Sequence, residues 1–162
     1  MTIVLARIDS RLIHGQVLEA WVPYCKATCI VVANNEISPV QKIVMQAAVP
    51  SKMHVYIDKI SEIAEQFYHG KFADERVLLL FSSSHDALEA CRLGIPVTRL
   101  NLGNMHAGPG KLRYTSTIAM NAEDIDNFQH LTESGVSISV QSVPANRETR
   151  FSKLLKRKIP EC

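Results

Sequence analysis

Residues 77–81 read Val-Leu-Leu-Leu-Phe, an uninterrupted apolar run, and Ser82-Ser83-Ser84 follows at once. A run this short and this apolar is typical of a strand that is buried on both faces of a parallel sheet. Ser84 then suits the N-cap of a helix, which we expect to end before Gly94. A buried strand followed directly by a capped helix is the repeating unit of an α/β fold.

The same alternation extends in both directions along the chain. Other apolar runs typical of strands occupy residues 4–8, 29–33, 53–57, 97–102 and 136–143, and a weaker strand pattern covers residues 113–120. Helical patterns lie between them. The sequence therefore predicts a single domain over residues 1–162, with a three-layer α/β/α arrangement and a mostly parallel central sheet of about seven strands.

One of the predicted helices shows how these signals combine. Ser38 and Pro39 suit an N-cap and a first helical position. The face expected to be buried consists of apolar residues that recur at helical spacing, namely Val40, Ile43, Val44, Ala47 and Ala48. Trp21 and Met45 are likewise expected in the core.

Bulk composition excludes several functional classes. The chain is 46% hydrophobic and 21% charged, as is ordinary for a soluble globular protein, and its net charge of +2 is too small to favour nucleic acid or a membrane surface. Apolar runs are too short to span a bilayer, and Arg7 and Asp9 interrupt the N-terminus too early for a signal peptide. We therefore expect a cytoplasmic protein.

Cysteine spacing gives no sign of a metal centre or a cofactor. The four cysteines, Cys25, Cys29, Cys91 and Cys162, form neither a disulfide framework nor a CxxC pair. Cys25 and Cys29 lack a second pair that would complete a zinc site. The expected function therefore needs only amino-acid side chains.

The richest loop in the sequence is residues 7–17, Arg-Ile-Asp-Ser-Arg-Leu-Ile-His-Gly-Gln-Val. It leaves a buried strand and enters a helix, so His14 falls just before a helix N-terminus, where free N–H groups favour an anion. Arg7 and Arg11 add positive charge, and Gly15 lets the backbone approach a bound group closely. We predict that Arg7, Arg11 and Gly15 bind phosphate.

Three uses of His14 have to be distinguished. The two arginines disfavour a metal ligand, and Asp9 is the only carboxylate nearby. The same arginines favour phosphoryl transfer, since they stabilise charge on the phosphoryl oxygens and keep the imidazole neutral for attack. A partly buried histidine beside a structural Asp9–Arg11 ion pair explains the loop equally well. The loop by itself leaves phosphoryl transfer and this structural role open.

Two further loops lie at the expected ligand-binding edge of the sheet. Ser82 and Ser83 are candidate phosphate donors at a helix N-terminus, with simple helix capping as the alternative. His106 lies in the loop that follows the strand of residues 97–102. The remaining histidines lie in predicted strands or helices and are interpreted as surface or packing residues.

The order of motifs resembles the mannose/fructose/sorbose family of enzyme IIB components of the bacterial sugar phosphotransferase system. Residues 7–17 look like the signature of that family, and Trp21 follows at its usual place. Similar motifs recur in order along nearly the whole chain. Two departures are Asn35, where the family more often has Asp, and Asn104, which replaces a glycine.

The resemblance implies a mechanism and partners. A phosphorylated enzyme IIA would donate its phosphoryl group to Nδ1 of His14. His14 would pass it to a sugar presented by the membrane components IIC and IID, which places the chain in the cytoplasm at the transporter. The family pattern implies that Arg11 holds the phosphoryl oxygens and that Asp9 orients Arg11 or the loop.

Alternatives to this transport function are a regulatory phosphocarrier and a non-catalytic partner-binding module. The identity of the sugar and the oligomeric state cannot be deduced from the sequence.

Overall fold

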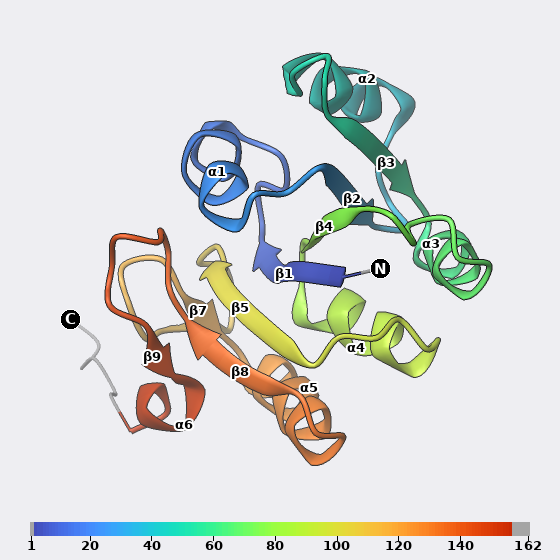
Figure 1. The fold of residues 1–162 in the computed structure, drawn as a ribbon. Coiled ribbons are helices and arrows are strands. Elements are labelled where there is room, and N and C mark those ends of the chain that lie inside the picture. The colour runs from blue at the N-terminus through green and yellow to red at the C-terminus, as the bar shows by residue number, and fades with distance from the viewer. Residues whose placement is uncertain (1, 157–162) are drawn as a thin grey trace.

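A single twisted sheet forms the centre of the molecule (Figure 1). The structure is a computed structural model and describes residues 2–156. Seven strands lie in the order β3 (His54–Asp58), β2 (Cys29–Ala33), β4 (Arg76–Phe81), β1 (Thr2–Asp9), β5 (Arg99–Asn104), β8 (Ser137–Val140) and β9 (Thr149–Arg150). All neighbours pair in parallel except β8 and β9, which are antiparallel. The predicted fold class is confirmed.

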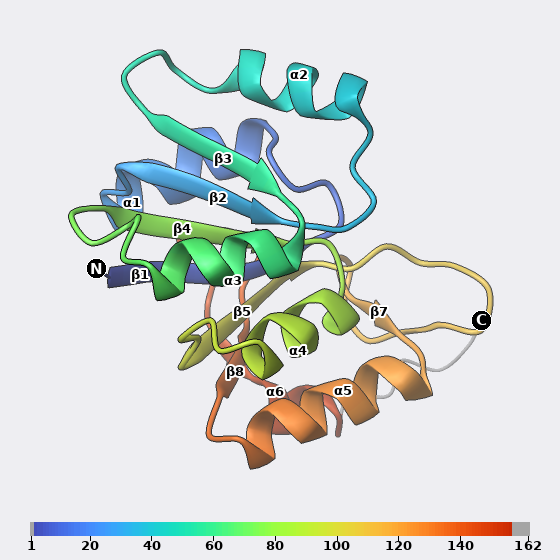
Figure 2. The ribbon, with the colours of Figure 1, turned by 90° about the vertical axis from the view of Figure 1, so that its right-hand side faces the viewer.

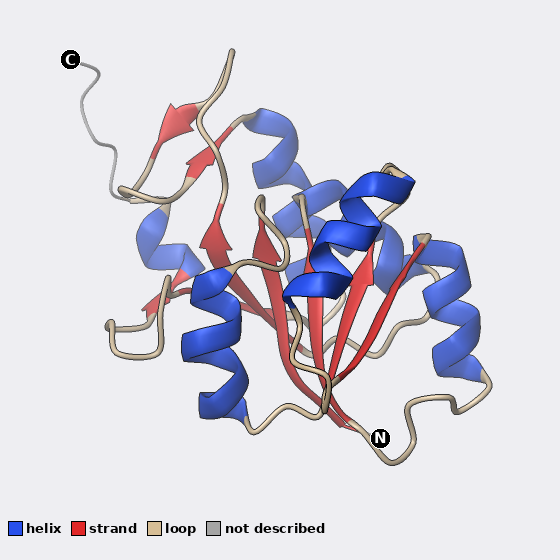
Figure 3. Ribbon diagram, turned by 90° about the horizontal axis from the view of Figure 1, so that it is seen from above, coloured by secondary structure: helices blue, strands red, loops and turns tan. Residues whose placement is uncertain are grey.

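Helices cover both faces of this sheet (Figures 2 and 3). On one face lie η1 (Val17–Trp21), α1 (Val22–Cys25) and α2 (Pro39–Ala48), and on the other lie α3 (Ile60–Tyr68), α4 (Ser84–Arg92) and α5 (Ala122–Glu133). The short α6 (Phe151–Leu154) packs against α5, where the rings of Phe151 and Phe128 are 5.1 Å apart. None of the helices described is long and apolar enough to cross a membrane.

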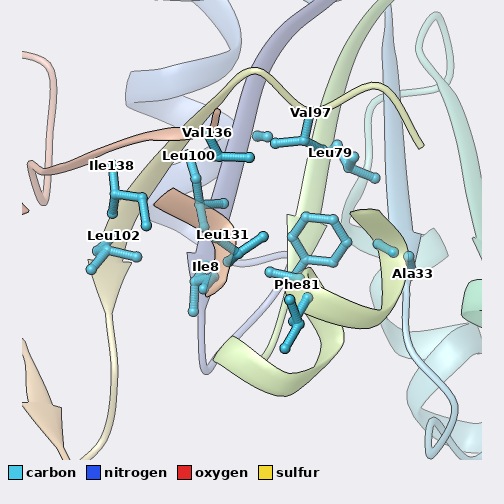
Figure 4. Packing of buried hydrophobic residues seen from close by; sticks show 14 of the residues in the cluster. Ile8, Ala33, Leu79, Phe81, Val97, Leu100, Leu102, Leu131, Val136 and Ile138 are labelled. Carbon is cyan, nitrogen blue, oxygen red and sulfur yellow. The ribbon is translucent and has the colours of Figure 1, made fainter. Parts of the chain in front are cut away.

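Strand β4 contributes to both hydrophobic cores because successive side chains point to opposite faces of a sheet. Leu79 and Phe81 pack with the α3–α5 layer, and Figure 4 shows them beside Leu100 and Leu131. Leu78 and Leu80 belong to the core beneath η1 and α2. The uninterrupted apolar run is thus explained by burial on both faces.

Helix α2 begins as predicted, but the prediction of which of its residues are buried is wrong. Ser38 is the N-cap and forms a capping box with Gln41, and Pro39 is the first helical residue. Val40, Ile43 and Val44, which were expected inside, are 70%, 65% and 63% exposed. Ala47 and Ala48 are exposed as well.

The contacts of α2 explain this orientation. Met45 is buried against the sheet, and the ammonium of Lys42 lies 3.4 Å from Asp58 at the end of β3. Lys42, Met45 and Val49 are spaced as i, i+3 and i+7 and form the inward face. The expectation that Met45 and Trp21 belong to the core is confirmed, since they are 9% and 2% exposed.

Two strand predictions need correction. The single strand expected over residues 113–120 is a separate antiparallel pair, β6 (Leu112–Arg113) and β7 (Ala119–Met120). Strand β8 ends at Val140 instead of residue 143, because the Gln141 side chain bonds to the carbonyl groups of Pro144 and Asn146 and stabilises a turn. The seventh strand of the main sheet is β9, which the sequence did not predict.

Candidate phosphoryl-transfer site

The His14 loop leaves the carboxyl end of β1, between β4 and β5. Ile8 pairs with Phe81 of β4 on one side and with Leu102 of β5 on the other. The connection that leaves β1 runs to β2, on the β4 side, whereas the connection that leaves β5 runs to β8, on the other side. The loop therefore lies where the direction of the connections reverses. Open α/β sheets bind their ligands at this kind of position.

Two apolar side chains anchor the loop from beneath. Leu12 and Ile13 are buried with the residues under η1 and α2. Leu12 has φ 58°, a left-handed conformation that leucine rarely adopts, and its N–H donates to the Asp9 carbonyl at 2.9 Å. Such a conformation costs about 1–3 kcal/mol and persists only where the surroundings enforce it. The anchors therefore fix where His14 leaves the loop.

The helix that follows starts directly after His14, as predicted. The His14 carbonyl accepts from the N–H of Leu18 at 3.1 Å, and helical residues run from Gly15 to Cys25. The middle of this segment, η1, is π-helical. π-Helical turns occur frequently at functional sites.

Asp9 holds the imidazole of His14. Nε2 of His14 lies 3.0 Å from Oδ2 of Asp9, and the His14 side chain is 16% exposed while that of Asp9 is fully buried. An ionised carboxylate only accepts hydrogen bonds, so Nε2 carries the proton. In the neutral ring this leaves the lone pair on Nδ1.

The Asp9 carboxyl is held in its ionised form. Burial by itself raises its pKa, but the hydrogen bond with His14 and the backbone N–H of Arg11 act in the opposite direction. The positive charge of Arg7 adds to them, and the pKa of Asp9 falls from 3.8 to about 2. Asp9 is therefore a charged acceptor throughout the neutral range.

Arg11 lies on the solvent side of the same carboxylate. Its backbone N–H donates to Oδ1 of Asp9 at 3.0 Å, and its Nε does so at 3.4 Å. A terminal nitrogen donates to Gln16 Oε1 at 3.1 Å, and the side chain is 41% exposed. Both the ion pair expected between Asp9 and Arg11 and an accessible positive charge close to His14 are therefore present.

Arg7 is placed differently from Arg11. It has no exposed surface, and its guanidinium donates to Oδ2 of Asp9 at 3.0 Å from below. Burial lowers the pKa of this guanidinium, and the charge of Asp9 offsets part of that shift. Phosphate binding by Arg7 stays a prediction, and in this structure its guanidinium has no exposed surface and donates to Asp9 instead.

The serines after β4 belong to a neighbouring network. Ser82 donates to Asp86 at 2.9 Å and accepts from Asn34 at 2.7 Å, and Ser83 caps α4 by accepting from the Asp86 N–H. The carboxylate of Asp86 puts negative charge at this helix N-terminus. Phosphate binding by Ser82 and Ser83 stays a prediction, and it would require the bond from Ser82 to Asp86 to open.

Gly15 and the loop after β5 complete the edge. A Cβ added to Gly15 would meet no atom within 4 Å, so open space lies beside His14. The backbone N–H of His106 donates to Ser10 Oγ at 3.1 Å, while His106 itself is exposed. Asn104 Oδ1 is buried without a hydrogen-bond partner in the described part of the chain. The loops of residues 10–15 and 104–106 thus meet at this edge.

Asn35, the other departure from the family pattern, has a structural role. Its Oδ1 accepts from the N–H of Ile60, the first residue of α3, at 3.0 Å. Its amide donates to Glu89 at 3.3 Å.

Within residues 2–156, no group of three or more histidine, cysteine, aspartate or glutamate residues is arranged to hold a metal ion.

The sequence analysis missed the residues that surround Arg7. Asn101 and Gly103 of β5 and the carbonyls of Gln141 and Ser142 all contact or face its guanidinium. A signal was present in β5, where Arg99, Asn101 and Gly103 alternate with Leu100 and Leu102.

Comparisons with known proteins agree with this architecture. The profile of the family described as "PTS system sorbose subfamily IIB component" matches residues 3–161. The chain is 32% identical over 148 residues to the sorbose-specific EIIB component of Klebsiella pneumoniae, covering 90% of each chain. It is 36% identical over 156 residues to an N-acetylgalactosamine-specific IIB component of Escherichia coli, covering 94% of this chain and 98% of the relative.

Solved structures and a longer relative extend the likeness. The crystal structure of the IIB domain of the Klebsiella pneumoniae sorbose permease superposes with a TM-score of 0.92 at 30% identity, covering 98% of this chain and 99% of that one. The mannose-specific EIIAB component of Escherichia coli is 28% identical over 159 residues, which span 49% of that relative.

The fold and the site define a class of α/β proteins that carry a histidine loop at the carboxyl end of the central strand. The chain belongs to the sorbose subfamily of IIB components of the sugar phosphotransferase system. It is accordingly a phosphotransferase component of sugar uptake.

Proposed function

We propose that Nδ1 of His14 is the atom that carries the phosphoryl group. The observation that supports this proposal is the hydrogen bond of 3.0 Å between Nε2 of His14 and Asp9. Because Nε2 donates its proton to Asp9 in a hydrogen bond and retains that proton, Nδ1 has the free lone pair that a nucleophile needs.

The transfer steps follow from this arrangement. The Nδ1 lone pair forms a bond to phosphorus as the bond between phosphorus and the donor nitrogen breaks, and the proton stays on Nε2 facing Asp9. Positive charge that develops on the ring is stabilised by the Asp9 carboxylate. In the second step a sugar hydroxyl attacks phosphorus and loses its proton to solvent, while Nδ1 recovers its lone pair.

Arg11 is proposed to bind the phosphoryl oxygens. Its side chain is 41% exposed and contacts the same Asp9 carboxylate as His14, and it carries a permanent charge in a planar fork that matches phosphate oxygens. Gly15 supports the same step by leaving open space next to the ring. Arg7 and Asp9 act beneath the ring.

The proposed donor is a phosphorylated enzyme IIA, and the proposed acceptor is a sugar bound by IIC and IID membrane components. The relative in which an A and a B component share one chain supports IIA as the partner. Partial exposure of His14 suits a group that two proteins must reach in turn. We infer that the chain works in the cytoplasm, associated peripherally with its transporter.

The test is phosphorylation of the purified chain by enzyme I, the histidine phosphocarrier protein, phosphoenolpyruvate and a set of related IIA proteins. Intact mass and peptide mapping measure the product. We expect one acid-labile phosphoryl group on the unmodified chain and on the control His106→Ala, and none on His14→Ala. Acceptance by His14→Ala at the unmodified rate would contradict the assignment, as would failure with every charged IIA.

A further inference from the structure

Arg7 is a fully buried charged residue beneath the site. One terminal nitrogen of its guanidinium donates to Asn101 Oδ1 at 2.6 Å and to the Gln141 carbonyl at 3.0 Å. The other donates to Asp9 at 3.0 Å and to the Ser142 carbonyl at 2.9 Å. This one group therefore connects the end of β1 to β5 and to the chain that leaves β8.

The neighbours of Arg7 are shaped around it. Its Cζ lies 5.1 Å from the centre of the Trp21 ring, and Trp21 itself donates to the Ser142 carbonyl at 3.0 Å. A Cβ built on Gly103 would lie 1.9 Å from Cζ of Arg7. Any side chain at position 103 would therefore overlap the guanidinium, which four hydrogen bonds hold in place.

The link from Arg7 to the reacting ring passes through one oxygen atom. Oδ2 of Asp9 accepts from Arg7 at 3.0 Å and contacts Nε2 of His14 at 3.0 Å. Arg7 is fully buried and cannot touch a docked protein or a sugar, so it acts on transfer through the residues that it contacts, of which Asp9 is the one that contacts His14.

We propose that Arg7 is a positioning residue for phosphoryl transfer. Its guanidinium lies in the space that Gly103 leaves free and links the Asp9 carboxylate to β5 and to the chain that follows β8. In this way Arg7 sets the orientation and the tautomer of His14. This proposal rests on the assignment of His14 as the phosphoryl carrier. Lysine cannot replace Arg7, because a single ammonium does not reach the four acceptors on both sides of a planar fork.

Three graded variants test the proposal. Arg7→Lys keeps the charge and loses the fork, and Gly103→Ala keeps Arg7 and takes its space. Asn101→Ala is the mildest for Asp9, because the contact that it removes from Arg7 is on the nitrogen that does not face Asp9, although it also removes the bond from the Asn101 amide to the Gln141 carbonyl. Gly108→Ala is the matched control, since a Cβ there meets nothing within 4 Å.

The first readout does not depend on phosphorylation. The ¹⁵N shifts of the His14 ring, measured on the unphosphorylated protein while the ring is neutral, report which nitrogen carries the proton. We expect Nε2–H alone in the unmodified chain and in Gly108→Ala. A shift toward the mixture of tautomers of a free imidazole is expected in Arg7→Lys and Gly103→Ala, and a smaller one in Asn101→Ala.

The second readout is steady-state transfer from phosphorylated IIA. Arg7→Lys is expected to lower kcat roughly 10- to 100-fold with KM for IIA unchanged, because a misplaced nucleophile slows chemistry while the docking surface stays intact. Folded variants with an unmodified ring tautomer and kcat would overturn the role of Arg7. If His14 of the unmodified chain did not accept phosphate, the proposed function would fail. The tautomer data would still decide whether Arg7 positions the His14 ring.

Discussion

The two halves of the central sheet differ in the kind of residue that they bury. In the half formed by β2 and β4, every residue of β2 is buried and β4 is apolar on both faces. In the half formed by β5 and β8, polar residues alternate with apolar ones, and Asn101 of β5 accepts a hydrogen bond from the buried guanidinium of Arg7 in β1. The site loop leaves β1, which lies between the two halves.

Apolar packing and buried hydrogen bonds contribute differently to the stability of the fold and to the position of His14. Apolar packing in the first half has no directional demands beyond shape, so it stabilises the fold without determining where His14 points. The second half must satisfy each buried polar group with a partner, because an unpaired one is costly at low dielectric. Its hydrogen bonds therefore fix positions as well as contribute stability.

The largest expected effect on stability lies in the apolar half. Leu79→Ala removes a side chain with no exposed surface and should destabilise the chain by about 2–5 kcal/mol. Urea unfolding measures this loss. Phosphoryl acceptance per folded molecule should stay unchanged, and a lower rate in fully folded protein would show that the two halves are not separable.

Arg11 provides the next largest effect, on rate instead of stability. Arg11→Ala should slow phosphoryl acceptance roughly 100-fold, and Arg11→Lys should fall between it and the unmodified chain, since charge is kept but the fork is lost. Rapid-quench kinetics with phosphorylated IIA measure both. Arg92→Ala is an exposed control on α4. Equal rates for alanine and lysine would reduce Arg11 to a structural role.

Acid should remove the contribution of Asp9 to the free energy of unfolding. Its pKa of about 2 in the folded chain lies below the ordinary value of 3.8, so this contribution is complete above about pH 4 and is lost as the pH falls through 2. The difference in unfolding free energy between the unmodified chain and Asp9→Asn should shrink by about 2 kcal/mol over that range. The exposed variant Asp74→Asn is the control, and a constant difference for Asp9→Asn would contradict the network.

Gly15 should give the smallest change in stability. Since its Cβ would meet nothing within 4 Å and the residue is helical, Gly15→Ala should leave stability unchanged or raise it by up to about 1 kcal/mol. Transfer should nevertheless slow several-fold, because the phosphoryl group or the partner uses that space. Gly108→Ala is again the control. An unchanged rate would show that the space is not used.

Hydrophobic pattern and local capping predict much of the fold, although the N-cap of α4 is Ser83 and not Ser84. The buried strands, the Ser38 cap and the position of His14 before a helix all depend on neighbouring residues. Prediction from the sequence failed where long-range contacts decide. Helix α2 buries Met45 and places Lys42 near Asp58, so that Val44 faces solvent, although the periodicity of its apolar residues predicts the opposite.

The same limit applies to the site. His14, Asp9 and Arg11 are close in sequence, and the structure brings them together. Arg7 was interpreted as a phosphate ligand because its sequence neighbours suggested it. Apart from Asp9, its partners are Asn101 and the carbonyls after β8, which are 94 to 135 residues away. The polar positions of β5 are visible in the sequence, but the sequence does not show that they bind Arg7.

The account depends most directly on which nitrogen of His14 carries the phosphoryl group. Two-dimensional ¹H–¹⁵N spectra of the chain, labelled with ¹⁵N-histidine and phosphorylated through IIA, distinguish the two positions. Phosphorus on Nδ1, with a proton retained on Nε2 facing Asp9, is the predicted result. Phosphorus on Nε2 would contradict the account, because that nitrogen is the one that Asp9 holds.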